Sequence, residues 1–151
     1  MPQSHARVHV HIIFSTKDRS PFLADEDIRK QMHAYLASIM AEYESPARIV
    51  GGSVDHVHIL AALSRTNTIA KIVGEAKRNS SKWIKTKGGE FGSFQWQNGY
   101  GAFSVSFSKV PDVHQYIANQ MKHHEKVSFQ TEYRAFLRKH GVELDERYVW
   151  D

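Results

Sequence analysis

The chain has 151 residues, of which 41% are hydrophobic and 24% are charged, and its net charge is +4. These values are typical of a one-domain globular protein, and the mild positive charge favours an anionic partner such as nucleic acid. The absence of cysteine excludes disulfides and thiolate metal sites. No apolar run is long enough for a signal peptide or for a membrane span of roughly 18 residues, so we expect a cytoplasmic protein without a membrane partner.

Strands and helices alternate in the pattern of apolar residues. Residues 8–17 are rich in β-branched and aromatic residues, which predicts a first strand. From Asp25 to Glu44 apolar residues recur every three or four positions, which predicts a helix. The same criteria predict strands at 47–54 (with a Gly-Gly bend or bulge), 56–63 and 99–107, and helices at 67–86, 111–126 and 130–139.

This element order, β-α-β-β-α-β followed by helices, predicts an α+β fold. It is the order of the ferredoxin-like split βαβ arrangement, in which two helices cover one face of an antiparallel sheet. We expect one domain over residues 1–151, with a core at about 8–127 and a C-terminal extension at about 128–151. The sequence predicts no role for this extension beyond packing of Tyr148 and Trp150 onto the core.

Two histidines separated by one residue, His56 and His58, lie in the predicted third strand. Alternation places both side chains on one face, about 6.6 Å apart along the strand, where they can bind one ion. His9 and His11 repeat this pattern in the first strand, which neighbours the third strand in this fold. The second pair is the stronger candidate because it follows Asp55 and the Gly-Gly bend, which leaves the first pair as a supporting layer or a solvated edge.

Tyr116 and Gln120 lie four residues apart in the predicted helix 111–126, so they share a helix face. They flank an apolar stripe of Val113, Ile117 and Met121. A tyrosine beside such a stripe usually packs, and a glutamine one turn later is usually solvated. A glutamine oxygen can also bind a cation, and the tyrosine would then stand next to that cation.

Several motifs in order resemble the HUH (His-hydrophobic-His) endonucleases with one catalytic tyrosine. They are DHVH at 55–58, WQNGYGAFSVS at 96–106, and Tyr-x-x-x-Gln at 116–120, with HIIFSTKDR near the N-terminus and RYVW at the end. The chain is most similar to the small transposases of the insertion-sequence 200/605 type, and the resemblance covers nearly its whole length.

The resemblance implies that His56, His58 and Gln120 hold Mg²⁺ or Mn²⁺ and that Tyr116 is the nucleophile. The implied reaction cleaves and rejoins single-stranded DNA through a 5′-phosphotyrosine link, without ATP. A free tyrosine has a pKa near 10, so metal assistance at the phosphate suits this chemistry. Imidazole ligands by themselves suit zinc, copper or nickel. The acceptor of the tyrosine proton stays open, since Lys122, His123 and His124 also fit a solvated helix end.

A basic stripe opposite the apolar face of helix 67–86 is a candidate for phosphate contacts and consists of Lys71, Arg78, Lys82 and Lys85, with Arg65, Lys77 and Lys87 nearby. Such a stripe is also typical of a solvated face. Phe91, Phe94 and Trp96 could stack on unpaired bases or pack in the core. The resemblance implies DNA hairpins as partners and a homodimer, and it leaves open whether the Tyr116 helix acts in cis or in trans.

Two other functions fit parts of this pattern. A domesticated relative would bind hairpin DNA or RNA without cutting it. A metal-dependent phosphoesterase would use both His-x-His pairs and a water nucleophile, which would make Tyr116 dispensable. The intact set of His56, His58, Tyr116 and Gln120 favours the transposase.

Overall fold

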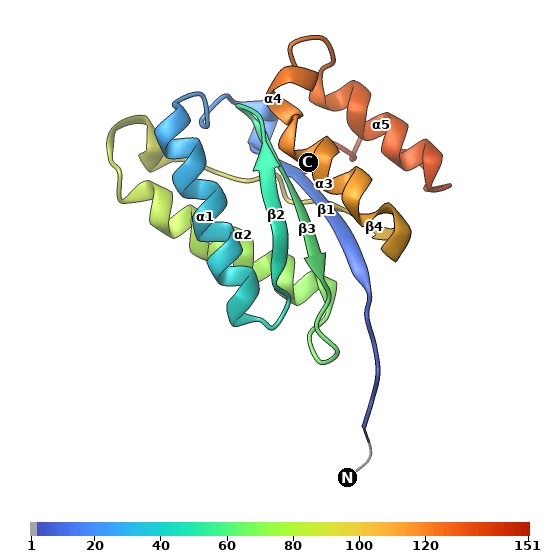
Figure 1. Ribbon diagram of the computed structural model, residues 1–151. Helices are drawn as coiled ribbons and strands as arrows, with labels where there is room; N and C mark the ends of the chain where they lie inside the picture. The colour runs from blue at the N-terminus through green and yellow to red at the C-terminus, as the bar shows by residue number, and fades with distance from the viewer. Residues whose placement is uncertain (1–2) are drawn as a thin grey trace.

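The computed structural model describes residues 3–151 and confirms the α+β fold. Its four strands form one antiparallel sheet in the order β2-β3-β1-β4, which is the ferredoxin-like order (Figure 1). The strands are β1 (His9–Ser15), β2 (Ala47–Gly52), β3 (His56–Ala62) and β4 (Gly101–Val105). The α-helices are α1 (Glu26–Glu42), α2 (Ile69–Lys85), α3 (Val110–Ala118), α4 (Gln120–His123) and α5 (Phe129–Lys139), and short 3-10 helices lie at Lys17–Arg19, Gly89–Ser93 and Phe107–Lys109.

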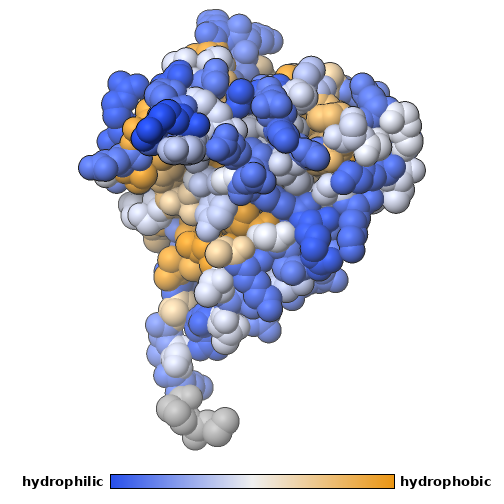
Figure 2. Space-filling view, turned by 180° about the vertical axis from the view of Figure 1, so that it is seen from behind, coloured by the Kyte–Doolittle hydropathy of each residue, from blue (hydrophilic) through white to orange (hydrophobic). Residues whose placement is uncertain are grey.

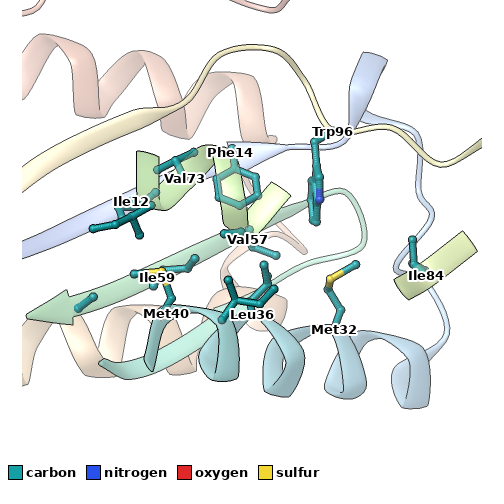
Figure 3. Packing of buried hydrophobic residues seen from close by; sticks show 14 of the residues in the cluster. Ile12, Phe14, Met32, Leu36, Met40, Val57, Ile59, Val73, Ile84 and Trp96 are labelled. Carbon is teal, nitrogen blue, oxygen red and sulfur yellow. The ribbon is translucent and has the colours of Figure 1, made fainter. Parts of the chain in front are cut away.

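Helices cover both faces of the sheet. α1 and α2 pack on one face against alternate residues of the two central strands, including Ile12 of β1 and Ile59 of β3. Figure 3 shows Met32 and Leu36 of α1 pointing toward this apolar layer. On the other face, Ile13 packs with α5 and Leu60 packs with α3. The expected pair of helices on one face is thus present, and α3 to α5 add a second layer that encloses the opposite face (Figure 1).

Side-chain caps fix where three helices begin. Asp25 accepts a hydrogen bond from the backbone N–H of Ile28 at the start of α1, and Thr68 accepts one from Lys71 at the start of α2. Ser128 does the same for α5. Because each cap satisfies an N–H group that the helix leaves unpaired, it stabilises the helix by about 1 kcal/mol.

The two glycines of β2 serve close packing rather than a bulge. The register of β2 against β3 shifts between Ala47 and Ile49, so the expected bulge lies there and β2 continues through both glycines. A Cβ atom on Gly51 would lie 2.7 Å from the carbonyl oxygen of Ile117. The missing side chain therefore allows α3 to lie directly on the sheet.

The predicted helix 111–126 is wrong as a continuous element. It is interrupted at Asn119, whose φ of −99° and ψ of 17° end α3 and precede the short α4. Ile117 is buried as expected, but Met121 is 43% exposed and does not belong to the apolar stripe. The interruption turns Gln120 toward the sheet, where it is buried.

The C-terminal tail packs only in part as expected. Trp150 is half-buried against the cluster that α5 forms with the sheet, whereas Tyr148 is 63% exposed. Seen from behind, most of the surface is hydrophilic, with a hydrophobic area just above the N-terminal segment (Figure 2). Within residues 3–151, no helix combines the length and apolar composition needed to cross a membrane.

Candidate metal centre and tyrosine

The histidine pairs of β1 and β3 meet on the sheet face that α3 to α5 cover. Both His56 and His58 are completely buried. His11 Nε2 lies 2.8 Å from His58 Nδ1, so the first pair supports the second through His11. His9 does not reach the site, because its Nε2 accepts a hydrogen bond from Arg48.

Neighbouring groups orient both imidazoles toward a common point. His56 Nδ1 donates to the Asp55 carboxylate at 2.7 Å, which leaves Nε2 to face the interior of the site. The bond to His11 engages Nδ1 of His58, so its Nε2 also faces the site. Partners of this kind fix the tautomer and the ring orientation of metal-binding histidines.

Gln120 lies beside the two histidines that the resemblance groups with it. Its side chain is 1% exposed, and its Oε1 lies 3.0 Å from His56 Nε2. The structure therefore brings the three predicted ligands together, although Gln120 begins α4 whereas Tyr116 lies in α3, which ends at Ala118.

Glu132 of α5 lies at the centre of this cluster. Its buried carboxylate was not among the candidates from the sequence. Glu132 is 4% exposed. Its Oε1 lies 3.0 Å from His58 Nε2, 3.6 Å from His56 Nε2 and 3.2 Å from His124 Nε2. One carboxylate oxygen thus faces three imidazoles that come from β3 and from the segment after α4.

The second oxygen of Glu132 faces the candidate nucleophile. Glu132 Oε2 accepts a hydrogen bond from the Tyr116 hydroxyl and another from Gln120 Nε2 at 3.1 Å. His123 Nε2 also lies near, 3.4 Å from both the Tyr116 hydroxyl oxygen and Glu132 Oε2. Tyr116 is therefore connected to the predicted ligands through a single carboxylate.

The enclosed surroundings change the acidity of these groups. Burial lowers the pKa of His58 to about 4, against the opposing effect of Glu132, so His58 is neutral at neutral pH. Burial alone would raise the pKa of Glu132, but the neighbouring imidazoles of His124 and His58 outweigh it and keep this carboxyl ionised. Burial and the hydrogen bond to Glu132 raise the pKa of Tyr116 well above its ordinary value.

This donor set fits a divalent cation. One ligand atom from each of His56, His58, His124 and Glu132 lies within 4.8 Å of all the others. Within residues 3–151, His124 Nε2 is buried and has no hydrogen-bond partner, although it lies 3.2 Å from Glu132 Oε1. Neutral imidazoles and an ionised carboxylate are the forms that bind metal ions.

The sequence contains one sign of the role of Glu132. In α5 the buried residues Phe129, Tyr133 and Leu137 form the face that packs on the sheet, and Glu132 lies on that face. A charged residue on the apolar face of an amphipathic helix indicates a buried partner. The identity of that partner depends on the tertiary packing.

A cavity of about 600 Å³ opens beside Tyr116, between β4, α3 and α5. Its walls include the aromatic rings of Phe103 and Phe136, which stack at a centroid distance of 5.6 Å. Lys109 and Lys139 lie among its lining residues. This cavity gives solvent a route to the tyrosine side of the site, whereas the histidine side is closed.

The predicted basic stripe of α2 is exposed but lies on the other side of the sheet. Its four side chains, of Lys71, Arg78, Lys82 and Lys85, all face solvent, and Arg78 pairs with Glu75. Because α2 packs on the face opposite α3, the structure does not bring these residues to the histidine site.

The aromatic residues before β4 have a structural role. Phe94 and Trp96 are buried in the core under α1 and α2, and Phe91 packs against the same core. For Phe94 and Trp96, core packing is therefore the correct alternative, and stacking on bases is not.

Comparison with known proteins agrees with this arrangement. Residues 4–120 match the model of the family described as IS200-like transposases, and no curated protein matches the chain. The fold is similar to the crystal structure of a candidate transposase from Deinococcus radiodurans R1, with a TM-score of 0.61 and 22% identity over 80% of this chain and 98% of that chain. It is also similar to a REP-associated tyrosine transposase bound to a REP hairpin, with a TM-score of 0.60 and 11% identity over 84% of this chain and 74% of that chain. Since the family match spans more than half of its length, the chain belongs to the family of IS200-like transposases.

Proposed function

We propose that the protein is a cytoplasmic DNA transposase that cleaves and rejoins single-stranded DNA, with Tyr116 as the nucleophile. The observation that supports this function best is the contact of the Tyr116 hydroxyl with Glu132, within the cluster that holds His56 and His58. This contact places the Tyr116 hydroxyl beside the side chains that we assign to the metal, which is where the proposed nucleophile has to lie.

In this proposal His56, His58 and Gln120 hold one divalent cation, Mg²⁺ or Mn²⁺. Such a cation would offset the negative charge of the scissile phosphate. The chain's own residues prepare the ligands for this task, because Asp55 orients His56 and His11 orients His58.

The chemical step transfers the 5′-phosphate of the cleaved strand to the tyrosine. The Tyr116 oxygen forms a bond to phosphorus while the bond from phosphorus to the 3′ oxygen breaks. That oxygen takes up one proton, which balances the proton lost by the phenol, and leaves as a free hydroxyl. The phenolic proton has two acceptors in reach, Glu132 Oε2 and His123 Nε2. The phosphotyrosine link conserves the energy of the broken bond, so a second 3′-hydroxyl can reverse the step and join strands without ATP.

We propose hairpin-containing single-stranded DNA as the substrate. The support is the family membership and the likeness to a tyrosine transposase that binds a REP hairpin. The cavity beside Tyr116, with two lysines and two stacked aromatic rings, suits an unpaired stretch of the strand. The basic face of α2 is available for the phosphates of a stem.

The resemblance also implies a homodimer, in which Tyr116 acts either in cis or in trans. In this structure Tyr116 already meets the histidine site of its own chain. If two subunits exchanged their Tyr116 helices, each site would contain the same residues, drawn from two chains.

Covalent capture tests the proposed function. The full chain is mixed with Mn²⁺ and a pool of hairpin-containing single strands, and protein–DNA adducts are counted after denaturation. We expect an adduct that Tyr116→Phe and His58→Ala abolish and that Tyr148→Phe, at an exposed tyrosine, retains.

Other results of this experiment would favour the other functions. Cleavage that survives Tyr116→Phe would replace the tyrosine mechanism with the water-using phosphoesterase. Tight hairpin binding with no cleavage in any metal would favour the non-cleaving relative.

A further inference from the structure

We propose that Glu132 and His124, from the C-terminal part of the chain, are themselves ligands of the metal ion. The inference deepens the proposed function and rests on it for the presence of a metal. It adds a third imidazole and a carboxylate to His56, His58 and Gln120. The resulting donor set selects a transition-metal ion such as Mn²⁺ over Mg²⁺.

The first argument is the missing counter-charge of Glu132. This carboxylate is 4% exposed, and within residues 3–151 its ion-pair partners are all histidines, with no lysine or arginine among them. Burying a carboxylate without a cationic partner is strongly unfavourable. A divalent cation between Glu132 and the imidazoles supplies the missing positive charge.

The second argument is the unsatisfied nitrogen of His124. Among the described residues its Nε2 is buried without a hydrogen-bond partner, although it lies 3.2 Å from Glu132 Oε1. Buried polar atoms nearly always have a partner, so an atom that lacks one calls for an explanation. Because this nitrogen lies in the same cluster as His56 and His58 Nε2, coordination of the shared ion explains it.

The third argument concerns where these residues lie in the chain. The family model matches residues 4–120, so Gln120 is its last matched residue and both His124 and Glu132 lie beyond it. The additional ligands therefore belong to the part of this chain that follows the shared core. Glu132 thereby gives a function to the extension at about 128–151, for which the sequence predicted none beyond packing.

The donor types determine which ion binds best. Mg²⁺ prefers oxygen ligands and retains several waters, whereas imidazole nitrogen suits transition metals and zinc. A site with three imidazoles should therefore discriminate strongly against Mg²⁺. The amide oxygen of Gln120 and the carboxylate of Glu132 are oxygen donors, which Mn²⁺ accepts.

Metal affinity in the absence of DNA tests this inference. Titration calorimetry of the full chain with MnCl₂ and MgCl₂ compares the wild type with Glu132→Gln and His124→Gln. We expect Mn²⁺ to bind at least about 100-fold more tightly than Mg²⁺, and each substitution to weaken Mn²⁺ binding at least about tenfold. Glu125→Gln, at an exposed glutamate of the same segment, is the matched control and should leave the affinity unchanged.

A spectroscopic measurement on the wild type keeps the test decisive if a variant fails to fold. Pulsed electron paramagnetic resonance of bound Mn²⁺ counts the coordinated imidazole nitrogens, and we expect three. Two nitrogens, or unchanged Mn²⁺ affinity in both folded variants, would overturn the inference.

The outcomes separate this inference from the proposed function. A wild type that binds Mn²⁺ through these residues but forms no DNA adduct contradicts the proposed function alone. An adduct together with unchanged affinity in both variants contradicts the further inference alone.

Discussion

Single residues decide which nitrogen each histidine presents. His56 and His58 each have a partner on Nδ1, namely Asp55 and His11, and so direct Nε2 into the site. His33 of α1 is different, because its Nε2 is buried without a hydrogen bond among the described residues. The two histidines of β3 are thus oriented toward the site, whereas the buried nitrogen of His33 has no partner that would stabilise a proton.

His33 should make the stability of the protein dependent on pH. Burial, followed by the charge of Arg29, lowers its pKa to about 4 in the folded chain, against 6.5 as the reference value. Between these values the unfolded chain binds the proton first, so stability falls as pH drops from 6.5 toward 4. We expect His33→Leu to remove about 1 to 2 kcal/mol of the loss seen between pH 7.5 and pH 5.

Urea unfolding at the two pH values measures this difference. His114→Leu, at an exposed histidine of α3, is the control and should leave the loss unchanged. An identical loss in wild type and His33→Leu would show that other groups cause the pH dependence.

At the scale of elements, one lysine connects α2 to the segment before β4. Lys77 Nζ donates to the carbonyl oxygens of Gln97, Asn98 and Gly99 at 2.8, 3.2 and 2.6 Å. The sequence grouped Lys77 with the residues near the basic stripe, but its ammonium group is used inside the protein. It positions the chain that leads into β4 and toward the cavity beside Tyr116.

Lys77→Met should therefore destabilise the fold rather than weaken DNA binding directly. Three carbonyl oxygens lose their donor, and we expect a loss of about 2 kcal/mol in the free energy of unfolding. Lys82→Met, on the exposed side of the same helix, should change it by less than about 0.5 kcal/mol. Thermal or urea unfolding of both variants measures the difference, and equal stability would show that water replaces the lysine without cost.

The elements also show what local sequence could and could not predict. Helix and strand types follow from apolar periodicity, and side-chain caps at Asp25, Thr68 and Ser128 explain where three helices begin. The interruption at Asn119 was not predicted, because the apolar spacing continues through Ile117 and Met121 and only the tertiary structure turns Gln120 inward. Helix propensity at asparagine is low but does not by itself end a helix.

The residues of the candidate site also form two groups, those that short motifs predict and those that only the fold brings in. His56, His58, Gln120 and Tyr116 lie in recognisable short motifs, and the structure brings them together. Glu132 reaches the site through the packing of α5 on the sheet, and His124 through the segment that follows α4. The apolar face of α5 indicates that Glu132 is buried, but its partners depend on the tertiary packing. Contacts between residues 74 positions apart, such as His58 with Glu132, depend on the completed fold.

At the scale of the whole molecule, the basic stripe of α2 and the candidate metal centre lie on different sides of the sheet. The exposed lysines of α2 lie on the side of the sheet opposite α3, whereas Tyr116 of α3 contacts Glu132 of α5. A hairpin stem bound on α2 would have to send its single strand around the sheet edge to reach the site. Binding of the stem and cleavage of the strand should therefore be separable.

A triple variant tests this separation. Lys71, Lys82 and Lys85 are replaced by glutamine, while Lys30→Gln on the exposed side of α1 is the control. We expect weaker hairpin binding. The slope of the logarithm of the binding constant against the logarithm of the salt concentration should become less steep by about 0.9 per lost phosphate contact. Adduct formation with a short strand that lacks a hairpin should stay as in wild type. Fluorescence anisotropy at several salt concentrations measures the slope, and an unchanged slope would show that the stem binds elsewhere.

Gly51 has a consequence for the tyrosine that it never touches. Because the carbonyl oxygen of Ile117 would meet a Cβ at position 51, the height of α3 above the sheet is set by the absence of a side chain on β2. Tyr116 is the neighbour of Ile117, so the hydrogen atom that Gly51 carries in place of a side chain determines how deeply Tyr116 sits. A side chain at position 51 would have to lift α3 or displace Ile117. The placement of the proposed nucleophile therefore depends on a residue that a search for catalytic motifs would not single out.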